Sequence, residues 1–238
     1  MRSSSIVAGN LLQAVRRLRP VLESLRVVKP ASFGLNQLDR KLLPYIGKRN
    51  GIYIEAGANN GLRQSNTAYL EFYLGWKGLL VEPIPELAEE CSQRRPASIV
   101  EQAALVSKDG APSTVSMTYC NLMSIVNGAR GSPEMDADHI ELGKQFLKKG
   151  DEPRTVTVPT ASLSSLVDKH HLSNIDLLSL DVEGFEEQAL GGMDWDRHSP
   201  SWIVVEANDP VAIQSLLGSR YDLVATLSHH DHLYKLKP

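Results

Sequence analysis

The 238-residue sequence is poor in cysteine and has no long apolar stretch. Its two cysteines, Cys91 and Cys120, are isolated, with no CxxC motif and no histidine nearby at metal-ligand spacing. This excludes a disulfide scaffold and suits a reducing compartment, so we expect a cytoplasmic protein. No apolar run approaches the about 18 residues that a membrane-spanning helix needs. With 42% hydrophobic and 22% charged residues, the composition is that of an ordinary globular domain.

Two common nucleotide-binding motifs are also missing. The turn Gly57–Gly61 reads Gly-Ala-Asn-Asn-Gly, which matches neither G-x-G-x-x-G nor G-x-x-x-x-G-K-[ST]. A P-loop is therefore excluded, and an NAD(P)-type oxidoreductase is disfavoured because the third glycine of the dinucleotide fingerprint is absent. A ligand that has a ribose but no pyrophosphate fits this turn best.

A strand that ends in an acid occurs twice around this turn. Residues 52–54 are β-formers that lead to Glu55, and residues 78–81 lead in the same way to Glu82. Glu82 follows Gly57 by 25 residues, close to the about 20 at which an acid binds ribose hydroxyls in Rossmann-type sites. S-adenosylmethionine fits this pattern. We expect Glu82 at its ribose and the backbone of the glycine turn at its amino-acid end.

Strands alternate with helices over residues 32–238, which predicts a doubly wound α/β sheet. The expected strands are 52–54, 78–82, 98–106, 175–181, 202–206, 221–227 and 232–236. The expected helices are 36–46, 65–74, 85–94, 162–169 and 184–190. The last two strands are close enough along the chain to pair antiparallel, so we expect a mostly parallel sheet with an antiparallel last strand.

An insertion interrupts this alternation. Residues 114–119 and 155–158 alternate as strands do and are expected to pair as an extra hairpin. The segment 120–153 between them is polar, with one weak helix around 136–148. Such a long excursion at the edge of a sheet is a candidate lid or acceptor-binding insertion. The alternative is a loop without a role.

Residues 1–31, here called the basic arm, are expected to form an amphipathic helix that Pro20 kinks or restarts. Its apolar residues are spaced four, three, four and three, at Leu11, Val15, Leu18, Leu22 and Leu25. Residues 1–50 hold ten Lys or Arg against two acids, whereas the remainder is acidic, so no nucleic-acid partner is expected. Three interpretations stay open. The arm packs on the catalytic domain or on a second subunit of a homo-oligomer, lies on a membrane surface, or is an organelle transit peptide.

Acids gather after two neighbouring strands, and there they face the cleft beside the glycine turn. These acids are Asp181 and Glu183 after one strand and Glu206 after the next, where the amide Asn208 follows. Methyl transfer to a hydroxyl needs a base or a metal, and Asp181 is the candidate base by position. Glu183 offers the same chemistry, or caps the helix that follows. Asp181, Glu206 and Asn208 also form a candidate Mg²⁺ ligand set. We do not favour it, because no His, Cys or second Asp completes the set.

A histidine cluster at residues 229–232 is the remaining candidate for acid–base chemistry. It falls in the turn between the last two strands. His230 is a candidate base there, because imidazole titrates near neutral pH. An exposed turn with no part in catalysis is the alternative.

Several motifs, taken in order, resemble the FkbM-type methyltransferases. They are Tyr53-Ile-Glu-Ala-Gly-Ala-Asn-Asn-Gly61, Ser65-Asn-Thr67, Gly75-Trp-Lys-Gly78, Val81-Glu-Pro83 and Asp181-Val-Glu-Gly184. The resemblance implies a class I methyltransferase fold and S-adenosylmethionine-dependent O-methylation, frequently of sugar hydroxyls or natural products. The chain departs from the usual pattern at Asn60, where an Asp is common.

We therefore predict an S-adenosylmethionine-dependent O-methyltransferase whose acceptor is a saccharide or a glycosylated small molecule. An NAD(P)-type oxidoreductase and a non-catalytic binding protein that kept the fold are the alternatives. The predicted catalytic residues are Asp181, Glu183 and His230. The predicted cofactor-binding residues are Glu55, Gly57, Ala58, Asn59, Gly61, Ser65, Asn66, Glu82, Ala103 and Asp181.

Overall fold

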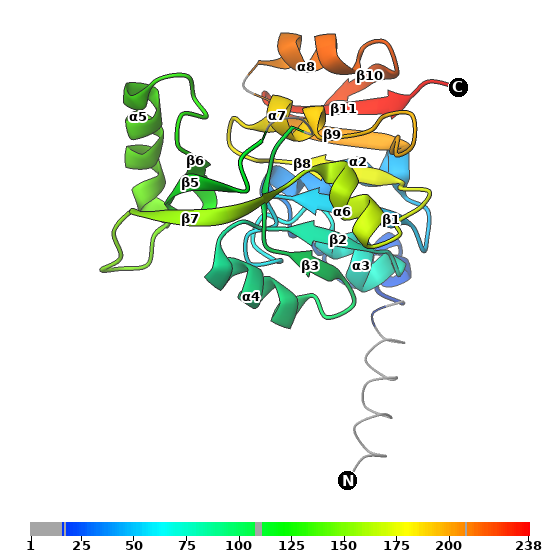
Figure 1. Ribbon diagram of the computed structural model, residues 1–238. Coiled ribbons are helices and arrows are strands. Elements are labelled where there is room, and N and C mark those ends of the chain that lie inside the picture. The colour runs from blue at the N-terminus through cyan, green and yellow to red at the C-terminus, as the bar shows by residue number, and fades with distance from the viewer. Residues whose placement is uncertain (1–15, 17, 108–110, 208) are drawn as a thin grey trace.

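The structure, a computed structural model, describes residues 16, 18–107, 111–207 and 209–238. Within them, seven strands form one sheet in the order β10-β11-β9-β8-β1-β2-β3 (Figure 1). The strands are β1 (Ile52–Ala56), β2 (Lys77–Val81), β3 (Ile99–Glu101), β8 (Leu177–Leu180), β9 (Trp202–Glu206), β10 (Tyr221–Thr226) and β11 (Asp231–Leu236). Only β11 runs antiparallel to its neighbours, so the predicted mostly parallel sheet with an antiparallel last strand is confirmed.

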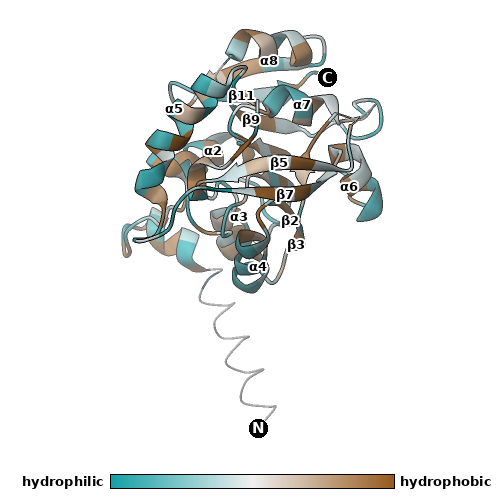
Figure 2. Ribbon diagram, turned by 60° about the vertical axis from the view of Figure 1, so that its left-hand side comes forward, coloured by the Kyte–Doolittle hydropathy of each residue, from teal (hydrophilic) through white to brown (hydrophobic). Residues whose placement is uncertain are grey.

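Helices cover both faces of the sheet, as a doubly wound architecture requires. They are α2 (Leu38–Ile46) with the short η1 (Leu35–Gln37) before it, α3 (Ala68–Leu74), α4 (Pro85–Arg94), α6 (Leu163–Lys169), α7 (Glu186–Gly191) and α8 (Pro210–Leu217). Alternate residues of β1 point to opposite faces: Tyr53 packs with α2 and α3, whereas Ile54 packs with α6 and α8. Figure 2 shows apolar strands at the centre and polar helix surfaces outside.

A second, smaller sheet stands beside the first. Its order is β4-β7-β5-β6, from β4 (Ala104–Leu105), β7 (Arg154–Ala161), β5 (Thr114–Tyr119) and β6 (Ile125–Val126). The antiparallel pairing of β5 with β7 is the extra hairpin that the sequence predicted. The single strand predicted over 98–106 is wrong. The chain breaks at the exposed Gln102, and the buried Ala104 and Leu105 then leave the main sheet to pair with β7.

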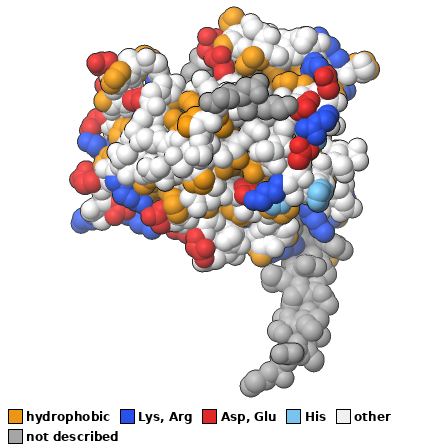
Figure 3. All heavy atoms as spheres, viewed as in Figure 1, with side chains coloured by type: hydrophobic (Ala, Val, Ile, Leu, Met, Phe, Trp, Pro, Cys, Tyr) orange, Lys and Arg blue, Asp and Glu red, His pale blue; other side chains and the backbone are white. Residues whose placement is uncertain are grey.

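The insertion 120–153 is folded and packed. It contains η2 (Asn121–Met123), β6, α5 (Pro133–Gly143) and η3 (Lys144–Phe146). Ser132 caps α5, because its hydroxyl accepts a hydrogen bond from the Met135 amide at 3.2 Å. Gly143 lies so close to Cys120 that a Cβ there would meet its sulfur at 2.8 Å. Figure 3 shows charged side chains of both signs along the left-hand edge of the molecule, where Figure 1 places α5.

The described part of the basic arm is helical at 16 and 18–24 and packs on α3. Its buried Glu23 accepts hydrogen bonds from Tyr69 at 2.9 Å and Arg40 at 2.7 Å. Contact with the catalytic domain, one of the three interpretations of the arm, is therefore present. Residues 1–15 and 17 lie outside the described residues. No helix in the described part of the chain is long and apolar enough to cross a membrane.

Candidate functional site

A cavity of about 740 Å³, a volume that includes space open to solvent, lies where β1, β2 and β8 end. Its walls come from the glycine turn, the end of β2, the start of the second sheet, the insertion and the end of β8. The lining residues are Ala56, Gly57, Asn59, Arg63, Gln64, Val81, Glu82, Pro83, Ala103, Ala104, Leu105, Met117, Asn121, Leu122, Ser124, Val126, Asp181, Val182, Glu183 and Phe185. The carboxyl ends of strands in a doubly wound sheet are the expected place for a ligand.

Gly57 lets β1 and β8 approach each other at the floor of the cavity. Its φ is +81°, and a Cβ there would lie 1.8 Å from the carbonyl oxygen of Asp181. The amides of Gly57 and Ala58 both donate to the carbonyl of Val81, at 3.0 and 3.1 Å, so the turn is held to the end of β2. Only glycine fits this position, because both the backbone conformation and the space exclude a side chain.

Glu82 lies at the same floor and is 5% exposed. Its carboxylate accepts hydrogen bonds from the amides of Asn59 at 2.8 Å and Ile84 at 2.9 Å. Burial raises the pKa of Glu82 to about 7, against the lowering effect of these two donors. Each carboxylate oxygen keeps a lone pair. Glu82 can therefore accept further hydrogen bonds from a ligand in the cavity.

Five predicted cofactor-binding residues lie outside this lining, and one of them, Asn66, lines a neighbouring pocket instead. Glu55 accepts hydrogen bonds from Ser65 at 2.9 Å, Thr67 at 2.6 Å and the amide of Asn66 at 2.7 Å. The fully buried Arg95 stands beside this network, 3.7 Å from Glu55. Direct cofactor contact by Glu55 and Ser65 is not supported by this placement, because their polar atoms hold the loop after the turn in place.

The other two, Ala58 and Gly61, pack inward. Ala58 is 2% exposed and belongs to the apolar cluster under the sheet. A Cβ on Gly61 would meet Cys91 and Arg95 at 2.9 Å, so Gly61 lets the turn lie against α4. Helix 65–74 was also predicted three residues too long, because α3 begins at Ala68. Ser65 still accepts from the Ala68 amide at 3.0 Å.

A smaller pocket of about 260 Å³ adjoins the cavity and shares Gln64 and Asp181 with it. Leu35, Leu38, Asn66, Glu206, His230 and Asp231 complete its lining. Asn66 donates from Nδ2 to Ser179 Oγ at 3.1 Å, while its buried Oδ1 has no hydrogen-bond partner among the described residues. Asp181 therefore forms part of the wall between two spaces, one large enough for a cofactor and one rich in carboxylates.

Carboxylates crowd around Asp181. Burial raises its pKa well above the usual value, and Glu206 and Glu183 raise it further. Burial also raises the pKa of Glu206, which the nearby His230 partly offsets. A carboxyl with a raised pKa is a stronger base once it is ionised. This environment is consistent with Asp181 as a proton acceptor.

Glu183 is held by two residues of the insertion. Its Oε2 accepts from Arg130 Nη2 at 3.2 Å and lies 3.4 Å from His139 Nε2. Burial raises the pKa of Glu183 to about 8 and lowers the pKa of His139 to about 4. Glu183 adopts a φ of +56°, a costly conformation for a residue with a side chain. The structure thus ties the insertion to the end of β8 at a strained residue in the cavity wall.

Glu183 does not cap α7. That helix begins at Glu186, whose own carboxylate accepts from the amides of Val182 at 3.2 Å and Gly184 at 3.0 Å. The capping alternative for Glu183 is therefore wrong, because the chain makes a tight turn through Gly184 before the helix starts.

Sequence reasoning missed several residues in and around the two pockets. Those that line a pocket are Arg63, Gln64, Asn121, Leu122, Ser124, Phe185 and Asp231. Arg130 and His139 contact Glu183 in the cavity wall. Most come from the insertion or from irregular turns, where no periodic pattern marks an inward-facing position. Asp231 carried a signal, since it lies inside the histidine cluster.

The profile of the methyltransferase FkbM domain matches residues 55–235. This chain belongs to the FkbM methyltransferase family. Its fold is that of class I methyltransferases, and its activity is S-adenosylmethionine-dependent methyl transfer. The family favours this activity over the oxidoreductase and the non-catalytic binding protein. No curated protein matches the chain.

Three solved structures similar to this chain are two methyltransferases and one fibrillarin. An FkbM methyltransferase from Methylobacillus flagellatus KT is 12% identical over 78% of this chain, with a TM-score of 0.46, and this chain spans 43% of that protein. A TehB-like S-adenosylmethionine-dependent methyltransferase from Corynebacterium glutamicum ATCC 13032 Kitasato is 12% identical, covering 98% of this chain and 100% of its own, with a TM-score of 0.45. Aeropyrum pernix fibrillarin with natively bound S-adenosylmethionine is 11% identical, covering 80% and 67%, with a TM-score of 0.42.

The cofactor of this FkbM methyltransferase is S-adenosylmethionine, and the cavity at the strand ends is the candidate place for it. Gly57 leaves its backbone open at the floor, and the carboxylate of Glu82 is available for ribose hydroxyls. Ala103 and Ala104 leave room for a flat ring beside them. Of the predicted cofactor contacts, Gly57, Asn59, Glu82, Ala103 and Asp181 line this cavity. Their roles in binding remain predictions.

The residues that could bind a metal differ from the candidate set of Asp181, Glu206 and Asn208. Asn208 lies outside the described residues. Glu206, His230 and Asp231 instead bring one ligand atom each within 4.8 Å of one another. His230 Nε2 lies 3.8 Å from Glu206 Oε2 and 3.6 Å from Asp231 Oδ2. His230 and Asp231 line the same pocket as Asp181, because β11 returns beside β9 and brings both residues to its end. The preference for a base over a metal stays a prediction.

Proposed function

We propose that this FkbM methyltransferase transfers a methyl group to a hydroxyl of a saccharide or of a glycosylated small molecule. The acidic pocket beside the cofactor cavity carries the proposal. Asp181, Glu206 and Asp231 line it together with Asn66, so it offers many hydrogen-bond acceptors close together. A polyol, which presents several O–H donors, matches such a surface.

Asp181 is assigned the base. It lines both spaces, so it reaches the acceptor hydroxyl at the place where that hydroxyl meets the cofactor cavity. Its raised pKa suits it to accept the proton as the oxygen attacks. When bound, S-adenosylmethionine supplies the methyl group as an activated sulfonium. Gln64, which also lines both spaces, is assigned the positioning of the acceptor.

The insertion is assigned the role of a lid. Asn121, Leu122 and Ser124 form part of the cavity wall, and Arg130 holds the insertion to Glu183. A covered cavity excludes water, which strengthens the electrostatic interactions inside it. Glu183 therefore anchors the lid in this proposal, and Asp181 remains the base.

A divalent metal is the second candidate for activating the hydroxyl. Two carboxylates and one imidazole, from Glu206, Asp231 and His230, suit a first-row divalent cation. Under this alternative, these residues would hold the metal next to Asp181, and it would act as a Lewis acid toward the acceptor oxygen. We favour the base, because these three ligands do not include Asp181, which lines both the cofactor cavity and the acidic pocket.

The test is methyl transfer from labelled S-adenosylmethionine to a panel of sugars, glycosides, phenols and amines. We expect product from sugars or glycosides. Glu206→Gln and Asp231→Asn should raise the KM of the acceptor about tenfold or more, because each removes a charged hydrogen-bond acceptor. The KM for S-adenosylmethionine should stay unchanged. Transfer to amines alone would refute the hydroxyl acceptor while leaving the methyltransferase assignment intact.

A further inference from the structure

The described helix of the basic arm packs on the protein through its polar side. Glu23 accepts hydrogen bonds from Tyr69 and Arg40 of the catalytic domain and from the Ala31 amide at 2.9 Å. Arg19 pairs with Glu23 at 2.9 Å and lies over the ring of Tyr73. An amphipathic helix usually packs through its apolar side, so the observed orientation is the reverse of the usual one.

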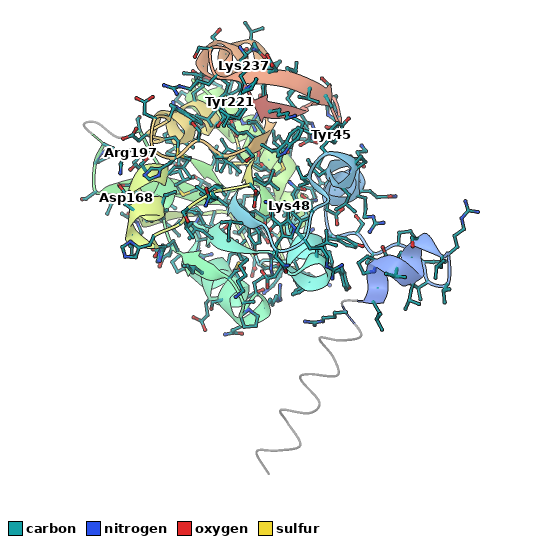
Figure 4. All side chains as sticks on the ribbon, turned by 90° about the vertical axis from the view of Figure 1, so that its right-hand side faces the viewer. Tyr45, Lys48, Asp168, Arg197, Tyr221 and Lys237 are labelled. Atoms are coloured by element: carbon teal, nitrogen blue, oxygen red, sulfur yellow. The ribbon has the colours of Figure 1, made fainter. Side chains whose placement is uncertain are left out.

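The opposite side of this helix is apolar and faces solvent. Leu18 and Leu25 are 57% and 67% exposed, and Val21 between them is 51% exposed. Val27, just after the helix, is 66% exposed. These four residues form the outer apolar face, and Figure 4 shows their segment, in blue, at the periphery of the molecule. A contiguous exposed apolar face of this kind marks an interaction surface.

The surroundings of this face are cationic. Both acids of residues 1–50 are buried: Glu23 in the contacts above, and Asp39 beneath Ser32 and the Phe33 amide, which donate to it at 2.6 and 2.8 Å. Arg26 and Lys29 are exposed beside the face and pair with no carboxylate among the described residues. The first fifty residues thus present positive charge to solvent without exposed acids.

From this combination we propose that the outer apolar face docks on an anionic lipid bilayer. The apolar side chains would enter the interfacial region, and Arg26 and Lys29 would face the lipid headgroups. A second copy of this chain fits less well, because six basic residues against one acid on each arm would repel one another. A nucleic acid would attract the basic residues, but it would leave the apolar side chains exposed to water.

Docking would leave the catalytic cavity free. The four residues of the outer apolar face line neither the cofactor cavity nor the acidic pocket. The proposal does not depend on which acceptor the enzyme uses.

Vesicle co-sedimentation of the full chain tests the proposal. We expect binding to phosphatidylcholine–phosphatidylserine vesicles (about 3:1) and much weaker binding to phosphatidylcholine alone. Binding should fall as salt rises from about 0.05 to about 0.5 M, because screening weakens the attraction to the headgroups. Equal binding to both kinds of vesicle would overturn the proposal.

Variants separate the two parts of the surface. Leu18→Ser with Leu25→Ser should reduce partitioning at least about tenfold, and Arg26→Glu with Lys29→Glu should do so only on anionic vesicles. Val211→Ser with Leu216→Ser is the matched control, since these α8 residues are similarly exposed, at 73% and 45%, but lie elsewhere.

Folding and oligomeric state complete the experiment. All the replaced side chains are exposed, so melting temperature and S-adenosylmethionine affinity should match wild type. Wild-type partitioning by the Leu18→Ser, Leu25→Ser variant would refute the docking. A lipid-free dimer in sedimentation velocity that this variant abolishes would assign the face to a second copy instead.

Discussion

Replacing Glu82 by glutamine removes the buried charge that the floor of the cavity offers to a ribose. The folded protein raises the pKa of this carboxyl from 4.5 to about 7, so keeping it ionised without a ligand costs about 3 kcal/mol relative to water. Hydroxyl donors from a bound ribose would stabilise the charged form, at about 1.5–3 kcal/mol for each charged hydrogen bond. Glu82→Gln should therefore weaken S-adenosylmethionine binding at least about tenfold at pH 8.

The pH dependence follows from the same pKa. The carboxyl must ionise before it can act as a charged acceptor, so wild-type affinity should fall about tenfold per pH unit below about 7. The side-chain amide that replaces the carboxyl in the variant does not titrate, so the affinity of the variant should be flat over this range. Because the folded-state pKa is raised, the cofactor-free protein should lose stability as pH rises from about 4.5 to about 7.

Calorimetric titration with S-adenosylmethionine and S-adenosylhomocysteine between pH 5.5 and 8 measures both effects. Glu86→Gln is the matched control. Glu86 lies four residues further on in the first turn of α4 and pairs with Arg154 at the surface, outside the cavity lining. A wild-type affinity that does not change with pH, or a Glu82→Gln variant that binds as wild type does, would refute the assignment of Glu82 to the ribose.

Three further predictions concern the base, the turn and the arm. Asp181→Asn should cut turnover by about 10² or more; activity that EDTA abolishes and Mg²⁺ or Mn²⁺ restores would contradict a metal-free base. Gly57→Ala should lower the unfolding free energy by about 2 kcal/mol more than Gly128→Ala in denaturant titrations, because both glycines have positive φ but only Gly57 lacks space for a Cβ. Glu23→Gln should speed trypsin cleavage after Arg26 several-fold, because the arm loses its buried ion pairs; an unchanged cleavage rate would mean that Glu23 does not hold the arm.

Substitutions in ion pairs at the protein surface should affect stability less than the substitution of the buried Glu23. Arg197 Nη1 lies 3.0 Å from Asp168 Oδ1, and both side chains are about half exposed. Figure 4 labels the two residues. Exposed pairs contribute little to stability. The contrast with Glu23 shows why burial of the charged group, rather than its pairing alone, decides which substitutions have a measurable cost.

Local patterns in the sequence determined the sheet and the floor of the cofactor cavity. Apolar runs that end in Glu55 and Glu82 predicted β1 and β2, and Gly57 marked the turn between β1 and α3. Each of these features is encoded within a few consecutive residues, because strand propensity and positive φ are properties of short segments. The position of Asp181 followed from the rule that strand ends meet at one edge of a doubly wound sheet.

Only the tertiary structure decided in which direction the side chains at these positions point and which residues they contact. The carboxylate of Glu55 accepts hydrogen bonds from Ser65 and Thr67 and does not line the cavity. The buried Arg95 lies beside this carboxylate. His230 and Asp231 line the same pocket as Asp181 only because β11 pairs with β9.

The insertion and the arm also make contacts that depend on tertiary structure. Arg130 reaches Glu183 across 53 residues of sequence, through a segment without periodicity. The described helix of the arm packs through Glu23, a buried carboxylate with four hydrogen-bond donors, whereas Leu18 and Leu25 of the apolar stripe stay exposed. Contacts between distant segments depend on register and packing, and no short stretch of sequence contains that information.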